Sequence, residues 1–161
     1  MWAQPDRTVL ARLAERTHRL LGSSSSPQAL SNVLWAVAKL RYDPGPTFVA
    51  DTVARALTLA DALGPADLLQ LCHSLVEMRY APGPRSLDAL AAAVDKQLPR
   101  FSEVQLKTVL TALARMGFDP PAAFGGRLRK HVDSLPPAGR SALASALALL
   151  GLEAAPPQAS V

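Results

Sequence analysis

Residues 34–46 read LWAVAKLRYDPGP, and the end of this stretch returns 38 positions later as LVEMRYAPGP at residues 75–84. Five of the six residues in the segment RYDPGP are identical in its second copy, RYAPGP. A further step of the same length leads from Met78 to Met116 and keeps the apolar pattern in phase. Self-similarity at a fixed period is the signature of repeat architectures. The chain is therefore expected to be an array of similar units, with a fourth, weaker copy at 147–152 that follows at the shorter spacing of 34.

Each period contains two helical patterns. Leu30, Val33, Leu34 and Val37 follow the i, i+3, i+4, i+7 spacing of one buried helical face, and Val49 begins a second such series. Helix starts are marked by Ser-Pro at residues 26–27 and by a Ser-x-x-Gln capping box at residues 102–105. The expected helices cover residues 6–21, 27–41, 46–62, 65–79, 84–98, 102–116, 121–134 and 137–151.

These patterns predict an all-α fold. The 161 residues include 29 alanines and 27 leucines but no isoleucine, a composition that favours helix over sheet. A single helix pair cannot cover its own apolar faces, so the pairs are expected to stack into an α-solenoid of about four antiparallel pairs. The predicted organisation is one domain over residues 1–161, with helix pairs at about 6–41, 46–79, 84–116 and 121–151 and a tail at 154–161.

The sequence argues against several classes of function. No apolar run is long enough to span a membrane, so no membrane partner is expected. The single cysteine, Cys72, stands next to His73, and neighbours in a helix point in different directions, so the two side chains cannot act as a nucleophile and its base. Cys72 also occupies the repeat position of Leu34 and Leu110, where a core residue is expected. We expect no enzyme, no cofactor and no metal site.

The charge pattern favours an anionic partner. Seventeen Lys and Arg against thirteen Asp and Glu give a net charge of +4. Basic residues gather on the first helix of each pair, above all at the two ends of the array. A plain solvated face would show the same pattern, but a basic concave surface that follows an RNA backbone is the sharper hypothesis. The candidate RNA-binding residues are Arg12, Arg16, Arg19, Arg55, Lys96, Arg127, Arg129 and Lys130.

The repeated helix pair with its period of 38, the segment ALSNVLWAVAKLRY at residues 29–42 and the Pro-rich turn that follows it resemble the octotricopeptide repeat. This family, related to the helical repeats found beside RAP and FAST-kinase-like domains, consists of α-solenoids that bind RNA in chloroplasts and mitochondria. The resemblance implies that one nucleotide is read per repeat by polar positions on the first helix of each pair. Here Thr17, Arg55 and Ala93 stand one period apart from each other and differ, as outward reading positions would.

About four repeats would engage about four nucleotides, too few to specify a transcript. We therefore expect a structural subunit that holds ribosomal RNA inside a larger organellar ribonucleoprotein. The mitochondrion is favoured over the chloroplast as the location, and the mitochondrial ribosome as the particle, and both expectations rest on the resemblance alone. Two alternatives stay open: an RNA-maturation or translation factor of the organelle, and a protein–protein scaffold. Neighbouring proteins are expected at the C-terminal end, where residues 142–150 are nearly all apolar.

Overall fold

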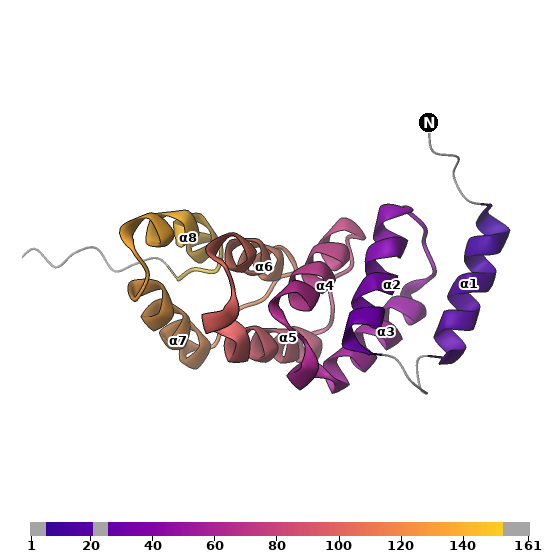
Figure 1. The fold of residues 1–161 in the computed structure, drawn as a ribbon, viewed down its shortest axis with the longest axis horizontal. Helices are drawn as coiled ribbons and strands as arrows, with labels where there is room; N and C mark the ends of the chain where they lie inside the picture. The colour runs from indigo at the N-terminus through magenta and orange to yellow at the C-terminus, as the bar shows by residue number, and fades with distance from the viewer. Residues whose placement is uncertain (1–5, 21–25, 153–161) are drawn as a thin grey trace, which may run out of the picture.

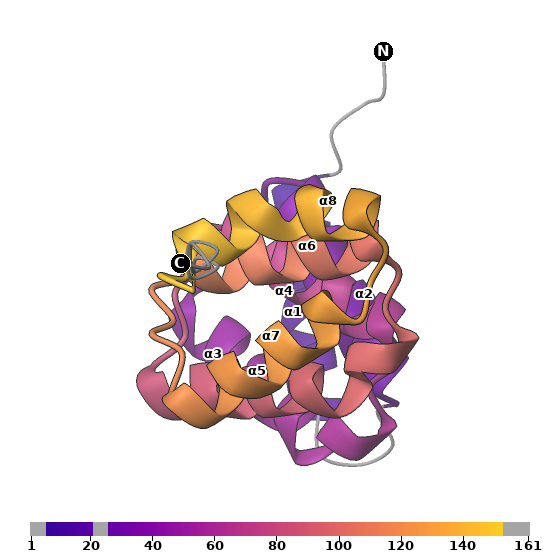
Figure 2. The same cartoon turned by 90° about the vertical axis from the view of Figure 1, so that its left-hand side faces the viewer.

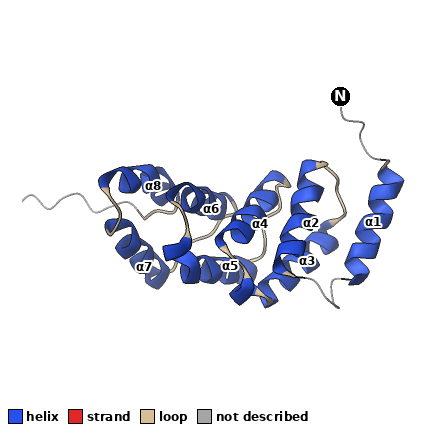
Figure 3. Cartoon of the chain, viewed as in Figure 1, coloured by secondary structure: helices blue, strands red, loops and turns tan. Residues whose placement is uncertain are grey.

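In a computed structural model that describes residues 6–20 and 26–152, the chain forms eight α-helices, and none of these residues lies in a strand (Figure 3). The prediction of an all-α fold is confirmed. The helices are α1 (Arg7–Leu20), α2 (Pro27–Lys39), α3 (Pro46–Thr58), α4 (Pro65–Glu77), α5 (Pro84–Gln97), α6 (Glu103–Arg115), α7 (Ala122–Asp133) and α8 (Pro137–Leu149). Each lies within a few residues of its expected range. The expected tail at 154–161 falls outside the described residues.

The end of the expected helix 46–62 is a short 3-10 helix instead, η1 (Ala60–Ala62) after α3. A second one, η2 (Leu98–Arg100), follows α5 and begins at the last residue of the expected helix 84–98. In η2, Pro99 lacks the N–H that an α-helix would need at that point. No such turn is assigned between α7 and α8, where the connection is shorter. This connection is two residues shorter than the one after α5, and α7 is itself two residues shorter than α5, which together account for a spacing of 34 rather than 38.

The helix starts agree with the expected caps. The Ser26 hydroxyl accepts a hydrogen bond from the Ala29 amide at 3.1 Å, and Pro27 opens α2. Ser102 and Gln105 form the reciprocal capping box: the Gln105 amide donates to the Ser102 hydroxyl, and the Ser102 amide donates to the Gln105 side chain. Each bond satisfies an amide that the first turn of a helix leaves without an internal partner.

The even-numbered helices all end in the same way. Two positions after each helix the backbone turns left-handed, and the next amide donates to a carbonyl five residues earlier, as in Tyr42 to Val37 and Phe118 to Leu113. This arrangement is the Schellman motif, which favours glycine at the left-handed position. Its left-handed residues have φ values of 48° at Arg41, 54° at Arg79, 83° at Gly117 and 65° at Gly151. The repeated turn therefore has one backbone geometry in all four copies.

The helices stack in two rows (Figure 1). We call α2, α4, α6 and α8 the even row, and α1, α3, α5 and α7 the odd row. Each helix packs against the helices two before and two after it in the chain, so every repeat adds one helix to each row. Seen along the array in Figure 2, the rows lie one above the other. The molecule is a helical-repeat solenoid, as the period predicted.

The core runs continuously between the rows and contains leucines from nearly every repeat. The repeat position that begins with Leu34 is fully buried in three copies, as Leu34, Cys72 and Leu110. Leu40 continues the apolar spacing of Leu30, Leu34 and Val37 but is exposed, whereas Met116 at the equivalent position is buried. No described helix of the even row precedes α2, so no described helix covers this side of its surface. None of the described helices combines the length and the hydropathy needed to cross a bilayer.

Candidate nucleic-acid interface

All eight basic residues predicted to bind RNA lie on the odd row. Arg12, Arg16 and Arg19 are on α1, Arg55 is on α3, Lys96 is on α5, and Arg127, Arg129 and Lys130 are on α7. The structure thus places them on one layer of the solenoid. It does not leave them equally available to a ligand, because several of them bond to other residues of the chain.

The arginines of α1 are the most accessible of the set. Arg12, Arg16 and Arg19 are exposed, and only Arg19 has an ion pair among the described residues, to Glu15 one turn away at 3.5 Å. Helix α1 carries four arginines against one glutamate. This excess makes the N-terminal end of the odd row strongly positive.

Arg55 is held against its own helix. Its Nη1 donates to the Thr58 hydroxyl at 3.2 Å, and its Nε is buried without a hydrogen-bond partner among the described atoms. The side chain is therefore half-buried rather than presented to solvent. A ligand could reach only the outer part of its guanidinium group.

Lys96 reaches back along the odd row to the preceding repeat. Its Nζ donates to the Asp61 carboxylate in η1 at 2.5 Å, and both side chains are well exposed. The hydrogen bond and the positive charge of Lys96 together lower the pKa of Asp61 below its ordinary value. The charge of Lys96 is therefore largely matched by this carboxylate.

Arg127 makes the corresponding contact one repeat later. Its Nε donates to the Asp95 carboxylate of α5 at 2.6 Å. The Asp95 side chain is only 16% exposed, and its second oxygen is buried without a hydrogen bond in the part of the chain that is described. Because this carboxylate is largely buried, its negative charge is compensated mainly by Arg127.

Similar polar bonds therefore join successive helices of the odd row. In the first repeat, His18 of α1 contacts Asp51 of α3 at 2.7 Å and packs its ring near Phe48. We call the three contacts His18–Asp51, Lys96–Asp61 and Arg127–Asp95 the odd-row ties. Helices α3 and α5 each contain as many acidic as basic residues, while α1 and α7 have an excess of positive charge. On α7, Lys130 is exposed and has no ion pair to another described residue, and Arg129 is exposed as well.

The prediction of an outward reading position is wrong. Ala93, the third member of the series with Thr17 and Arg55, is only 2% exposed, and the other two are half-buried. This position faces into the packed structure in the third copy. Its variation therefore reflects packing, at least in α5, rather than contact with a series of bases.

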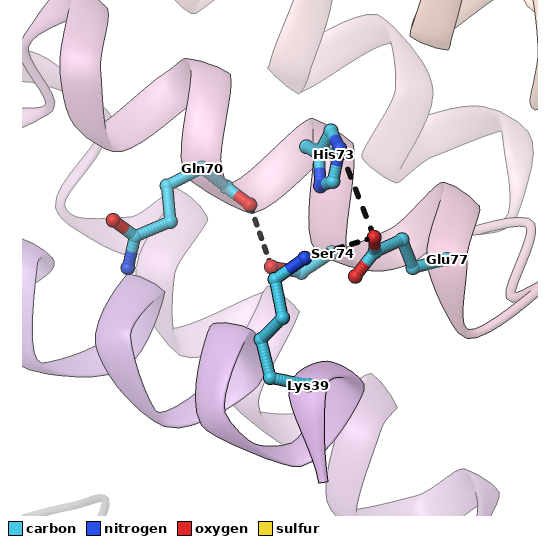
Figure 4. A network of polar contacts seen from close by, with 5 residues as sticks. All are labelled: Lys39, Gln70, His73, Ser74 and Glu77. Carbon is cyan, nitrogen blue, oxygen red and sulfur yellow. Dashed lines mark hydrogen bonds and ion pairs between the residues drawn. The ribbon is translucent and has the colours of Figure 1, made fainter. Parts of the chain in front are cut away.

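Sequence reasoning missed a polar network on the even row, shown in part in Figure 4. Lys39 of α2 donates to Glu77 of α4 at 3.1 Å, and His73 lies 3.9 Å from the same carboxylate. Gln70 of α4 also donates to Asn32 of α2 at 2.8 Å. In both pairs, Lys39–Glu77 and Asn32–Gln70, the two residues are one period apart. The sequence signal that could have revealed the network is therefore the presence of complementary side chains at the same position of successive repeats.

Cys72 is fully buried, as expected for a core position, and burial raises the pKa of its thiol to about 12. A thiol in this state is a poor nucleophile, because the thiolate is the reactive form. No group of three or more potential metal ligands occurs among the described residues.

A groove that the sequence did not suggest lies along the repeated turns. It has a volume of about 400 Å³ and is lined by the last residues of α2 and α4 and by the left-handed Arg41 and Arg79. Tyr42 and Tyr80 form its half-buried walls, while Glu77 and Asp43 add negative charge. The mixed charge gives this groove no clear preference for an anion.

Comparison of the chain with known protein families, with curated proteins and with solved structures found no match.

Proposed function

We propose that this protein binds RNA through the odd row as a structural subunit of a larger ribonucleoprotein. The observation that carries the proposal is the excess of positive charge on α1 and α7, with a charge-balanced middle. The two basic ends belong to one layer of the solenoid, so a single extended polyanion crossing that layer could contact both. The residues assigned to this contact are Arg12, Arg16, Arg19, Arg129 and Lys130, while Arg55, Lys96 and Arg127 act mainly within the fold.

The same arrangement argues for a weak binder that works inside an assembly. Phosphate contacts from two helix ends neutralise about four charges, which supports only modest affinity at physiological salt. Neighbouring subunits would then hold the chain on its RNA by raising its effective concentration. The resemblance to octotricopeptide repeats adds that the particle is organellar, and it makes the mitochondrial ribosome and its RNA the first particle to test.

A pair of matched charge reversals tests the role of the odd row. Lys130→Glu on α7 and Lys107→Glu on α6 make the same change of charge at two exposed lysines, one on each row. Binding of the full chain to a fluorescent single-stranded RNA is measured by anisotropy at about 50 mM salt. We expect Lys130→Glu to weaken binding roughly fivefold and Lys107→Glu to have little effect, because phosphate contacts are local. Equal losses in both variants, or no loss in either, would remove the basis for the proposal.

A further inference from the structure

Large exposed apolar side chains gather at the N-terminal end of the solenoid. Val9, Leu13 and Leu20 of α1 are 51%, 56% and 54% exposed. We call these three residues the α1 stripe, because their spacing places them on one side of the helix. Trp35 and Leu40 of α2 are exposed at the same end of the array. Exposed apolar side chains that gather at one end of a molecule mark an interaction site more often than scattered single residues do.

The repeat shows which way the α1 stripe faces. Leu13 is equivalent to Asp51 and to Arg127, and Leu20 is equivalent to Lys96. In each later helix of the odd row, one of these two positions bonds to the preceding helix or turn: Asp51 in α3, Lys96 in α5 and Arg127 in α7. On α1 the same positions carry leucines, and no described helix of the odd row precedes it. The α1 stripe therefore occupies a surface that each following repeat uses for a neighbour.

Helix α1 is also poorly supported by the rest of the fold. None of its residues is buried, and its main neighbour is α3 alone. Isolated helices of about 14 residues are marginal in water, and most helices depend on packing for their stability. A second helix laid along the α1 stripe would give α1 the two neighbours that α3 and α5 already have.

The charges beside the stripe indicate the chemistry of that second helix. Arg16 lies three residues after Leu13 and four before Leu20, and Arg12 lies three residues after Val9, so both guanidinium groups border the stripe. Neither arginine has an ion pair to a described residue. A helix that covers the leucines would bring its own edge against these two positive charges.

We propose that the α1 stripe docks an amphipathic helix of a partner protein, with an apolar face against Val9, Leu13 and Leu20 and acidic side chains against Arg12 and Arg16. A second copy of the chain is a poorer occupant. The opposite end of the odd row, α7, has an excess of positive charge too, so head-to-tail stacking would bring like charges together. RNA is poorer as well, because a phosphate backbone gains nothing from three aliphatic side chains.

Two designed helical peptides of about 18 residues serve as probes for the test. Both present leucines at i, i+3, i+4 and i+7, and one has glutamates on the flanking edge where the other has lysines. Binding to the full chain is measured by anisotropy. We expect the glutamate peptide to bind about tenfold more tightly than the lysine peptide. The Arg12→Glu/Arg16→Glu variant is expected to reverse that preference.

Leucine substitutions separate this proposal from RNA binding. Leu13→Gln is expected to weaken binding of the glutamate peptide about tenfold and to leave RNA affinity unchanged. Leu149→Gln is the matched control, because Leu149 is equally exposed but lies on α8 at the other end of the array. Circular dichroism verifies that both variants keep the helix content of the wild type.

Three results would overturn the proposal: no binding of either peptide, equal affinity for the two, or an equal loss in Leu149→Gln. Self-association of the wild-type chain that disappears in Leu13→Gln, measured by light scattering, would also overturn it, because the stripe would then belong to a second copy. A wild-type chain that binds the glutamate peptide but does not bind RNA would instead contradict the proposed RNA function alone.

Discussion

Two residues in the repeated turn adopt a backbone conformation that glycine would adopt more easily. Arg41 and Arg79 have positive φ at the position where the third and fourth copies have Gly117 and Gly151. A left-handed conformation costs an L-residue roughly 1–2 kcal/mol. Replacing such a residue with glycine removes this cost, but about 0.5–1 kcal/mol of the stabilisation is lost again because glycine makes the unfolded chain more flexible.

We therefore expect Arg79→Gly to raise the free energy of unfolding by about 0.5–1 kcal/mol in urea denaturation followed by circular dichroism. The reciprocal change, Gly117→Arg, serves as the control and should lower it by a similar amount. A loss of stability in Arg79→Gly would mean that the arginine side chain contributes more at the turn than its backbone strain costs.

Cys72 provides a second prediction at the scale of single residues. Its thiol pKa is raised to about 12 by burial, against an ordinary value of 9.0. As the pH rises above 9, the unfolded chain loses this proton and the folded chain keeps it, so the free energy of unfolding must fall. Between pH 8 and pH 10 we expect a loss of about 1 kcal/mol from this group, which Cys72→Val should abolish. Parallel pH profiles for the two proteins would show that Cys72 is not enclosed in the core.

The odd-row ties connect whole helices, and their contributions to stability should differ. Arg127 pairs with an Asp95 side chain that is largely buried, whereas Lys96 pairs with an exposed Asp61. Exposed ion pairs contribute little, but removing one partner of an enclosed pair leaves a charge without compensation. We expect Arg127→Ala to lower the free energy of unfolding by about 1–2 kcal/mol and Lys96→Ala to leave it nearly unchanged. Urea denaturation of both variants measures the difference, and equal losses would contradict the burial of Asp95.

Helices could be predicted from this sequence because several local signals agreed. The period of 38, the apolar spacing around Leu34 and the caps at Ser26 and Ser102 all marked the same boundaries. Cys72 could be placed in the core because its repeat equivalents are leucines. Local patterns of this kind are repeated in every copy, so each copy supports the assignment of the others.

The candidate site was less predictable because side-chain pairing depends on how the rows stack. Arg127 and Asp95 are separated by 32 positions and Lys96 and Asp61 by 35, spacings that follow from the connections between helices rather than from the repeat period. A count of charges on each helix therefore identified the basic row but did not show that Lys96 and Arg127 are bonded within it. The difference between Thr17, Arg55 and Ala93 in the sequence likewise did not show that Ala93 is buried, because its burial depends on how α5 packs.

At the scale of the whole molecule, charge and exposed apolar side chains are distributed unevenly along the solenoid. Its middle is neutral and tied together, its odd-row ends are basic, and its N-terminal end also carries the α1 stripe. Stacked repeats contact only their neighbours, so α1 and α8 each have a surface that no other described helix covers. The two proposed contacts, with RNA and with a partner helix, would therefore meet on α1, where Arg12 and Arg16 border the α1 stripe.

The salt dependence of RNA binding tests the central claim most directly. For a single strand, the logarithm of the binding constant falls with the logarithm of salt concentration by about 0.7 for each phosphate neutralised. Contact with about four phosphates predicts a slope of about −3 for the wild type, and Arg12→Glu/Arg16→Glu/Lys130→Glu should reduce it to about −1. A wild-type slope near zero, or an unchanged slope in the triple variant, would contradict RNA binding by the basic ends of the odd row.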